Sequence, residues 1–218
     1  MPVLEGVIKF RALHRTGKAG FSDHRAVARL LAWRSILFDL GLCGQDPDRY
    51  GGAGFGNLSL RIGAPSAPRG RRPFLITGTQ TGGVSELGSE QLCAVHSYDL
   101  NLNQVVSQGP VAPSSESMTH GAIYDLSSRI RCVVHVHSPA IWRRARELRL
   151  PTTRESVDYG TPEMALEVRR LYRDSPLAEL GVMAMGGHED GIIGFGSSSK
   201  QAAGRVLEIL ARARELGH

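Results

Sequence analysis

The chain is poor in the residues that build disulfide frameworks and membrane spans. Its three cysteines, Cys43, Cys93 and Cys132, lie far apart and none has a C-x-x-C partner. This spacing disfavours both a disulfide scaffold and a thiolate metal site, so we expect free structural thiols. No apolar run approaches the roughly 20 residues that a transmembrane helix requires, and no N-terminal segment resembles a secretory signal. We therefore expect a cytoplasmic protein with no membrane partner.

Aromatic residues and lysines are also scarce. Aromatic residues make up 6% of the sequence, and lysine occurs only at Lys9, Lys18 and Lys200. The net charge of +5 is carried mainly by arginines in short clusters that are interleaved with acids. Because aromatic residues do not alternate with these arginines, we expect solvated basic faces and no nucleic-acid partner. The charge is compatible with an anionic small molecule.

The length and composition are those of a globular protein. The 218 residues are 41% hydrophobic, which is ordinary for a chain that folds around an apolar core. The sequence contains no internal repeat and no low-complexity tract that would divide it. We therefore expect one domain that spans residues 1–218.

Apolar periodicity and turn residues predict a mixture of helices and short strands. Helical spacing begins after Ser22, a candidate N-cap, and proline marks two further helix starts at Ser138-Pro139 and Thr161-Pro162. Three expected helices, including the one after Ser22, cover residues 22–40, 113–128 and 197–216. The expected strands cover residues 57–62, 73–77, 94–99, 104–107, 131–137, 182–185 and 192–195. Short turns between several strands favour antiparallel pairing, so we expect an α/β sandwich.

The strongest local signal is a pair of histidines, His135 and His137, on the predicted strand 131–137. Residues two apart on a strand face the same side, roughly 6.5 to 7 Å apart along the chain. Two imidazoles at this separation can reach one metal ion at roughly 2.0 to 2.1 Å each. The pattern alone fits equally well with two hydrogen-bonded histidines on a half-exposed strand.

Two further segments contain polar side chains that suit a binding site. His188 lies in a glycine-rich turn between two apolar strands, and glycines allow a tight backbone around a projecting side chain. Ser114, Ser115 and Glu116 stand at a predicted helix start, where hydroxyls and free N–H groups suit an anion such as phosphate. A polar hairpin tip and plain helix capping are the respective alternatives.

Taken in order, these segments resemble the class II aldolase/adducin family over nearly the whole chain, and fuculose-phosphate aldolase-like proteins in particular. The motifs are GNLSLR at 56–61, FLITGTQTGG at 74–83, SSESMTHGAIY at 114–124, HVHSP at 135–139, YGTPEMA at 159–165 and GGHEDGI at 186–192. The resemblance implies a three-layer αβα sandwich with a central, mostly antiparallel sheet. It also implies a homotetramer with active sites at the subunit interfaces.

The resemblance implies a role for each motif. The metal ligands would be His135, His137, His188 and Glu116, with Glu116 also acting as general acid/base. The metal would be Zn²⁺ or another divalent ion such as Mn²⁺, Co²⁺ or Fe²⁺. The pocket for a phosphate or similar anion would be lined by Gly56, Asn57, Thr81, Gly82, Ser114 and Ser115. Thr77-Gly78 is an alternative to Thr81-Gly82, and His120 is expected to be structural or to support the ligands.

These residue types suit cleavage of a carbon–carbon bond next to a carbinol. A dication can stabilise the enediolate as a Lewis acid, and a carboxylate can move the proton. No lysine lies in the motifs, which disfavours a Schiff-base mechanism. We expect a divalent-metal-dependent lyase of the aldolase type, acting on a small hydroxy-carbonyl or sugar-phosphate substrate. The alternatives are a non-catalytic adducin-like interaction module, or a metal-dependent epimerase, decarboxylase or dehydratase.

The resemblance departs from the family pattern in two segments that contribute to the active site. In the sugar-phosphate aldolases, the segment after the H-x-H strand carries a tyrosine into the neighbouring subunit's site. Residues 138–158 contain no tyrosine, and one predicted helix follows His188 in place of the family's C-terminal extension. Tyr159 is present without an assigned position, so the sequence leaves the proton donor open.

Overall fold

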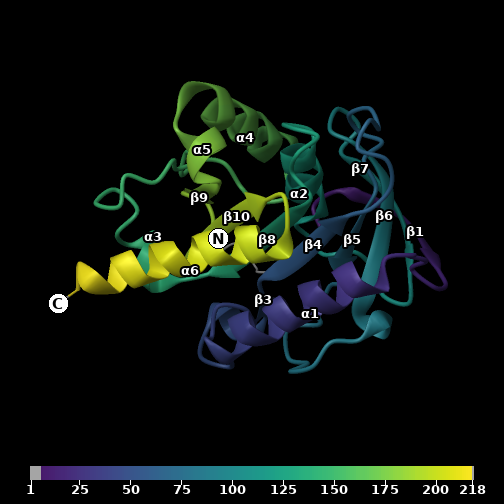
Figure 1. The fold of residues 1–218 in the computed structure, drawn as a ribbon, viewed down its shortest axis with the longest axis horizontal. Helices are drawn as coiled ribbons and strands as arrows, with labels where there is room; N and C mark the ends of the chain where they lie inside the picture. Colours follow the sequence, from purple (N-terminus) through teal and green to yellow (C-terminus); the bar gives the residue numbers. More distant parts are fainter. Residues whose placement is uncertain (1–5, 218) are drawn as a thin grey trace.

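The computed structural model describes residues 6–217 and contains a large sheet with helices on both faces (Figure 1). The eight strands of this sheet lie in the order β1-β7-β6-β5-β4-β8-β10-β9. Their bounds are β1 Arg11–Thr16, β4 Asn57–Arg61, β5 Phe74–Thr77, β6 Leu92–Asp99, β7 Gln104–Gly109, β8 Cys132–His137, β9 Val182–Ala184 and β10 Gly191–Gly196. Two short strands, β2 Gly44–Gln45 and β3 Gly54–Phe55, pair separately.

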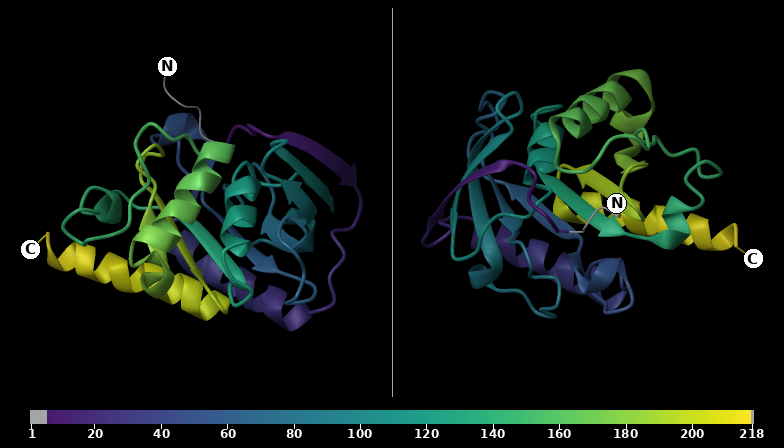
Figure 2. Two further views of the ribbon diagram at one scale, coloured as in Figure 1. Left: turned by 90° about the horizontal axis from the view of Figure 1, so that it is seen from above. Right: turned by 180° about the vertical axis from the view of Figure 1, so that it is seen from behind.

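The helices form the two outer layers. They are α1 His24–Asp39, α2 Ser117–Tyr124, α3 Pro139–Trp142, α4 Pro162–Asp174, α5 Leu177–Leu180 and α6 Ser199–Glu215, with short 3-10 turns at Tyr50–Gly52 and Ser89–Gln91. In the right view of Figure 2, α2 and α4 lie above the sheet and α1 and α6 lie below it. The fold is therefore the expected three-layer α/β sandwich. None of the helices within residues 6–217 is long and apolar enough to cross a membrane.

The sheet is mostly antiparallel, as expected. Among the described pairings of the large sheet, only β1 with β7 is parallel. All seven predicted strands are present within about two residues of their predicted ends. Strand β1 was not predicted because its sequence, RALHRT, lies on an exposed edge and lacks the apolar alternation of a half-buried strand.

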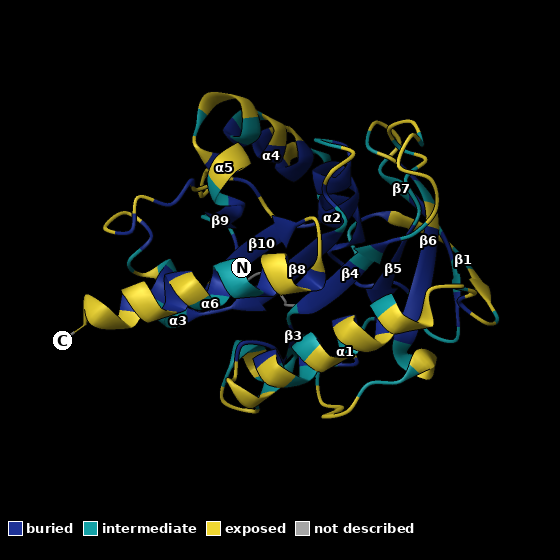
Figure 3. Cartoon of the chain, viewed as in Figure 1, coloured by how far each residue is buried: buried dark blue, intermediate teal, exposed yellow. Residues whose placement is uncertain are grey.

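The alternation of side chains along β8 separates two apolar cores. Cys132, Val134 and Val136 face α1 and α6, where they pack in one cluster with Leu30 and Leu37. The central strands are buried, while the outer faces of α1 and α6 are exposed (Figure 3). Burial of these apolar faces on one sheet is the main free-energy contribution that holds the layers together.

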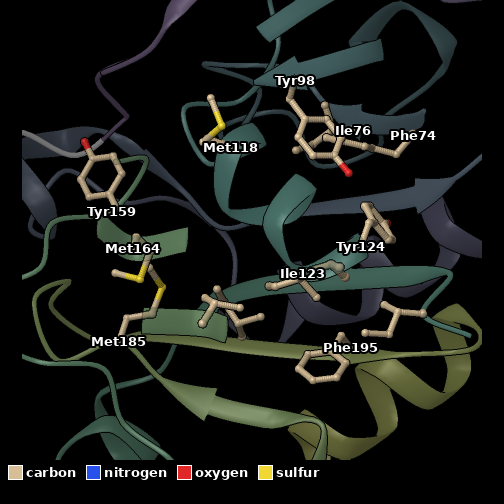
Figure 4. Packing of buried hydrophobic residues seen from close by; sticks show 14 of the residues in the cluster. Phe74, Ile76, Tyr98, Met118, Ile123, Tyr124, Tyr159, Met164, Met185 and Phe195 are labelled. Carbon is tan, nitrogen blue, oxygen red and sulfur yellow. The ribbon is translucent and has the colours of Figure 1, made fainter. Parts of the chain in front are cut away.

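Val133 belongs to the second core, on the opposite face of the sheet. Figure 4 shows part of this cluster, including Ile123 of α2, Met164 of α4 and Phe195 of β10. Because residues two apart share a face, His135 and His137 project to this same side as Val133. The alternation therefore places both imidazoles beneath α2 and away from α1 and α6.

Two helix starts differ from the prediction. The N-cap of α1 is Asp23 rather than Ser22, because the Asp23 Oδ1 atom accepts a hydrogen bond of 2.9 Å from Ala26 N. Helix α2 covers Ser117–Tyr124 and is shorter than the predicted range 113–128. Its expected first turn is instead a non-helical turn in which Ser114 Oγ accepts from Glu116 N at 3.3 Å. The starts at Ser138 and Thr161 are confirmed as N-caps of α3 and α4.

Candidate metal centre

Strand β8 places two histidines deep in the molecule. His135 pairs with Asn57 of β4 and Ile193 of β10, and both His135 and His137 are fully buried. Their Nε2 atoms lie 3.1 Å apart. The alternative interpretation, in which the two histidines lie on a half-exposed strand, is therefore wrong.

A glycine-rich turn brings His188 to the same point. The turn connects β9 to β10 and lies against residues 153–157. A Cβ atom on Gly187 would come 2.2 Å from Val157 O, and one on Gly186 would come 2.3 Å from Thr153 O. This close backbone approach requires glycine at both positions. His188 is 4% exposed, and one ligand atom from each of His135, His137 and His188 lies within 4.8 Å of the others.

Tyr159 supports His188 from the far side. The two rings stack with centroids 4.5 Å apart and an interplanar angle of 27°. The Tyr159 hydroxyl accepts a hydrogen bond of 3.2 Å from Val7 N, and Lys9 Nζ lies 4.0 Å from the ring centroid. The sequence left the position of Tyr159 open. In the structure, Tyr159 is buried beside the His188 imidazole.

Glu116 is the acidic side chain of the cluster. It lies at the start of α2, is 1% exposed, and its Oε1 atom is 3.4 Å from His188 Nδ1. Burial alone would raise the pKa of this carboxyl, but the adjacent His188 and His135 lower it to about 2. The group is therefore an anion at neutral pH. No lysine or arginine among the described residues forms a salt bridge with it.

The donor set fits a divalent cation. Burial lowers the pKa of His137 well below its usual range, so that imidazole is neutral and keeps a lone pair for a ligand bond. Two nitrogens bound to one ion at about 2.0 to 2.1 Å, and about 90° to 110° apart, would lie about 2.8 to 3.4 Å from each other. The observed separation of 3.1 Å between His135 Nε2 and His137 Nε2 falls in that interval. The buried Glu116 carboxylate supplies negative charge beside these nitrogens.

The predicted anion-binding residues meet in one small pocket beside this cluster. Gly56, Asn57, Thr81, Gly82, Ser114 and Ser115 all line it, together with Gly78 and neighbouring backbone. Asn57 is paired with His135, and Ser115 directly precedes Glu116, so the pocket adjoins the imidazoles. Its walls are glycine, serine, threonine and amide groups, which suit an anion bound largely by hydrogen bonds.

Of the alternative pair Thr77-Gly78, only Gly78 lines the pocket. Thr77 lies outside the residues that line the pocket, and its Oγ1 accepts a hydrogen bond of 3.2 Å from Leu58 N. Thr81 Oγ1 donates to Gly78 O at 2.8 Å, which closes the loop 78–82. Arg34 of α1 stabilises this loop by donating a hydrogen bond of 3.0 Å to Gly82 O.

His120 is buried within the protein core near Glu116 and His135. Its Nδ1 atom lies 2.7 Å from Ser59 Oγ, which is also 2.7 Å from the Tyr124 hydroxyl. Burial lowers the pKa of His120 to about 3, so the imidazole is neutral. This network agrees with a structural or supporting role.

The sequence patterns did not indicate Tyr50, which contacts the cluster from the loop before β3. Its ring centroid lies 4.6 Å from that of His137, and its hydroxyl donates to Asp190 Oδ2 at 2.7 Å. Arg49 donates to the same hydroxyl at 2.8 Å. Tyr50 belongs to no recognisable motif, and its position depends on how a Gly-, Asp- and Pro-rich loop folds over His137. No local sequence signal could have identified it.

Comparison with known proteins supports the fold and the family. The sequence model described as Class II Aldolase and Adducin N-terminal domain matches residues 48–215. Among curated proteins, no sequence matches significantly.

Solved structures of similar fold cover most of the chain. L-fuculose-1-phosphate aldolase from Thermus thermophilus is 22% identical over 87% of this chain and 93% of its own, with a TM-score of 0.60. A sugar-phosphate aldolase from Thermotoga maritima is 16% identical over 88% and 93%, with a TM-score of 0.65. YgbL from Klebsiella pneumoniae, described as an aldolase, epimerase or decarboxylase without a settled activity, is 20% identical over 90% of both chains, with a TM-score of 0.62. At these identities the similarity shows a shared fold.

Proposed function

Because the chain belongs to the family of class II aldolase and adducin N-terminal domains, we propose that it is a divalent-metal-dependent lyase of the aldolase type. The observation that carries the proposal is the meeting of three buried imidazoles and one buried carboxylate, from His135, His137, His188 and Glu116. Burial of the ionised Glu116 carboxylate is costly unless a cation balances its charge, since the group has lost its hydration.

In the proposed site, the three histidines and Glu116 hold the ion. When bound, a divalent ion supplies Lewis-acid stabilisation to a carbonyl oxygen and the adjacent hydroxyl oxygen of a substrate. Zn²⁺ is the first candidate for this donor set, with Mn²⁺, Co²⁺ and Fe²⁺ as the other candidates. Glu116 then exchanges a proton with the substrate at its carboxylate, starting from the ionised form that its lowered pKa favours.

The proposed substrate is a small hydroxy-carbonyl compound that carries a phosphate. The pocket lined by Gly56, Asn57, Thr81, Gly82, Ser114 and Ser115 adjoins the imidazoles and offers backbone and hydroxyl donors. Such donors bind a phosphate without a dedicated lysine or arginine. Two of the proteins with this fold are described as aldolases of L-fuculose 1-phosphate and of a sugar phosphate, which agrees with this class of substrate.

The proton donor is proposed to differ from that of the family's sugar-phosphate aldolases. Residues 138–158 contain no tyrosine, whereas Tyr50 of the same chain has its hydroxyl 2.7 Å from Asp190 and its ring against His137. Because residues 138–158 lack the tyrosine that donates the proton in the sugar-phosphate aldolases, epimerisation, decarboxylation and dehydration are alternative reactions for the same site. A non-catalytic, adducin-like interaction module is the alternative that needs none of these residues.

The proposal includes the surroundings of the site as well. We propose one domain over residues 1–218, a cytoplasmic location, no nucleic-acid partner and a homotetramer with sites at the subunit interfaces. Light scattering on the purified chain measures the assembly directly. A mass of four subunits agrees with the proposal, and a stable monomer contradicts the interface part of it.

A metal-exchange activity screen tests the function. The protein is stripped with a chelator, reloaded separately with zinc, manganese, cobalt or iron, and incubated with L-fuculose 1-phosphate and related hydroxy-carbonyl phosphates. Mass spectrometry of the products distinguishes carbon–carbon cleavage from epimerisation, decarboxylation and dehydration. We expect cleavage in at least one reloaded sample and none in the stripped sample. Full metal binding without turnover of any compound would favour the interaction module.

A further inference from the structure

A second cavity lies at the opposite end of β4, β8 and β10 from the histidines. It has a volume of about 560 Å³ and is formed between the N-terminal ends of α1 and α6 and the residues at the ends of β4 and β8. Figure 1 shows α1 and α6 running in the same direction, with both N-termini toward this side of the molecule. It shares no lining residue with the small pocket beside the imidazoles.

The cavity is lined by cations that lack acidic partners. Arg29, Arg131 and Lys200 line it, and within residues 6–217 none of them forms a salt bridge. Arg131 donates from one guanidinium nitrogen to Arg61 O at 3.0 Å, while its Nη1 is buried without a hydrogen bond to any described residue. The acid of the lining, Asp23, uses its carboxylate to cap α1. The cavity therefore carries an excess of positive charge.

The N-terminus of α6 adds further positive potential. Helix α6 has 17 residues, a neutral N-cap at Ser198 and no acidic residue in its first turn, whereas the end of α1 already carries the Asp23 carboxylate. Free N–H groups and the helix dipole make an end such as that of α6 favourable for an anion. Ser199, the first residue of α6, lines the cavity and is 7% exposed, and its hydroxyl makes no hydrogen bond to another described residue. Arg61 also lines the cavity and is 1% exposed, and its Nε atom is buried without a hydrogen bond to any described residue. A buried donor without a partner points to a ligand that would accept from it.

The remaining wall is apolar. Phe21, Trp33 and Leu60 line the cavity and are partly buried against the core beneath α1. A flat aromatic wall next to cations and free N–H groups suits a ligand with two chemically distinct parts. Inorganic ions alone would leave this apolar surface in contact with water.

We propose that this cavity binds a small organic anion, a phosphate or carboxylate joined to an apolar group. The acidic group lies at the N-terminus of α6, near Arg29, Ser199 and Lys200, and the apolar group packs against Trp33. This site is independent of the proposed lyase function, because none of its residues belongs to the metal cluster or to the small pocket beside it.

Fluorine NMR of the full chain labelled with 5-fluorotryptophan tests the proposal. The chain has two tryptophans, Trp33 in the cavity and Trp142 outside it, so the second resonance is an internal control. The Trp142→Phe variant assigns the two signals. Titration with phenyl phosphate is expected to shift the Trp33 resonance and to leave that of Trp142 unchanged. Inorganic phosphate should bind more weakly, and benzyl alcohol should give no saturable shift.

Two charge-matched double variants decide whether the cavity's cations are responsible. Arg29→Gln with Lys200→Gln removes one cation from each helix at the cavity. Arg25→Gln with Arg212→Gln removes from each helix one exposed cation that does not line the cavity. The first pair should weaken phenyl phosphate binding at least about tenfold, as expected for loss of charge-assisted contacts, and the second should change it less than about twofold.

Three results would overturn the proposal. A Trp33 resonance that none of the probes shifts would show that the cavity binds no such anion. Equal weakening by both double variants would show general charge attraction instead of a site. Equal binding of benzyl alcohol and phenyl phosphate would show an apolar pocket without anion selectivity. Metal content and turnover play no part in these readouts, so failure here leaves the lyase proposal untouched.

Discussion

At one end of β4, β8 and β10 lie three imidazoles and a carboxylate, whereas at the other end lie two arginines and the N-termini of two helices. His137 is the last residue of β8, and Arg131 immediately precedes its first. At the first end, Glu116 has no basic salt-bridge partner among the described residues, and at the second, Arg61 and Arg131 have no acidic one. Because the same strands supply both ends, the flanking turns and helix ends determine which charge each end attracts.

The two ends also differ in how their groups are held. At the imidazole end, glycines allow the turn before β10 to pack against residues 153–157, and Tyr159 stacks on His188. At the arginine end, Arg61 donates to the carbonyls of Ala64 and Pro65 at 3.1 and 2.9 Å. The first arrangement fixes side chains around one point, while the second leaves an open cavity between helices.

The largest expected effect is at the imidazole end. His137→Ala removes a proposed metal ligand, so bound metal should fall close to zero. This loss of metal affinity should exceed the roughly 10- to 100-fold loss expected for a residue that only hydrogen-bonds to a ligand. His96→Ala, at an exposed position on β6, is the control and should keep full metal content. Elemental analysis of both proteins, with circular dichroism to confirm folding, measures the difference. Unchanged metal in His137→Ala would exclude this residue as a ligand.

Glu116→Gln separates metal binding from proton transfer at the same end. The three histidines remain, so most of the metal should stay bound, while turnover on a substrate found by the screen should fall at least about 100-fold. Glu147→Gln, at an exposed position, should change neither quantity. If Glu116→Gln retained normal turnover, Glu116 would be a helix-start residue without a role in proton transfer.

Gly187→Ala tests the close packing that holds His188. A Cβ atom there would come 2.2 Å from Val157 O, so we expect a loss of about 1 to 3 kcal/mol in the free energy of unfolding, together with weaker metal binding. The matched control is Gly204→Ala in α6, where a Cβ meets nothing within 4 Å. That variant should gain about 0.5 to 1 kcal/mol, since alanine favours a helix interior. Urea denaturation of the two variants would contradict the account if both changes had the same sign.

Tyr50→Phe keeps the ring against His137 and removes the hydroxyl that donates to Asp190. We expect metal content to be unchanged and turnover to fall about tenfold, the effect of losing one hydrogen bond to a charged group. Tyr172→Phe, whose ring lies near Phe195 away from the cluster, provides the comparison. Equal kinetics for both variants would limit Tyr50 to packing.

The smallest effect concerns the three buried thiols, which are all free, as expected. Burial raises the pKa of Cys43 and of Cys93 to about 11, from an ordinary value of about 8.5. Since the neutral thiol is the native form, this contribution to stability is present below about pH 8.5 and is lost as the pH rises through about 11. Alkylation followed by peptide mass spectrometry should therefore be slow at pH 7.

The same alkylation experiment distinguishes the two ends of the strands. Cys43 lies behind Gly56 at the imidazole end, and Cys132 begins β8 at the arginine end. Removing the metal should speed alkylation of Cys43 several-fold and leave Cys132 unchanged, because local opening precedes reaction. Parallel acceleration of both thiols would indicate global destabilisation.

Much of the imidazole end could be predicted from the sequence because its signals are local. The spacing of His135 and His137 on a strand, and the glycines beside His188, each indicate a projecting side chain. The meeting of these segments was an inference from family resemblance, and the structure brings them together. The roles of the individual residues remain predictions until the variants are measured.

The rest depended on contacts between distant segments. Tyr50 contacts His137 across 87 positions of sequence, and no periodicity encodes that contact. The first turn expected for α2 is absent because Ser114 and Glu116 form a competing side-chain-to-backbone hydrogen bond. The cavity at the arginine end exists only once α1 and α6 pack side by side, so neither helix sequence predicts it alone.

The central claim is that the cluster at His135, His137, His188 and Glu116 is a metal site. The most direct test is elemental analysis of the untagged protein, purified without chelator. We predict about one divalent ion per chain, removed by chelator and restored by dialysis against zinc. Absence of stoichiometric metal, even after dialysis against zinc, manganese, cobalt and iron in turn, would contradict the claim and favour the interaction module.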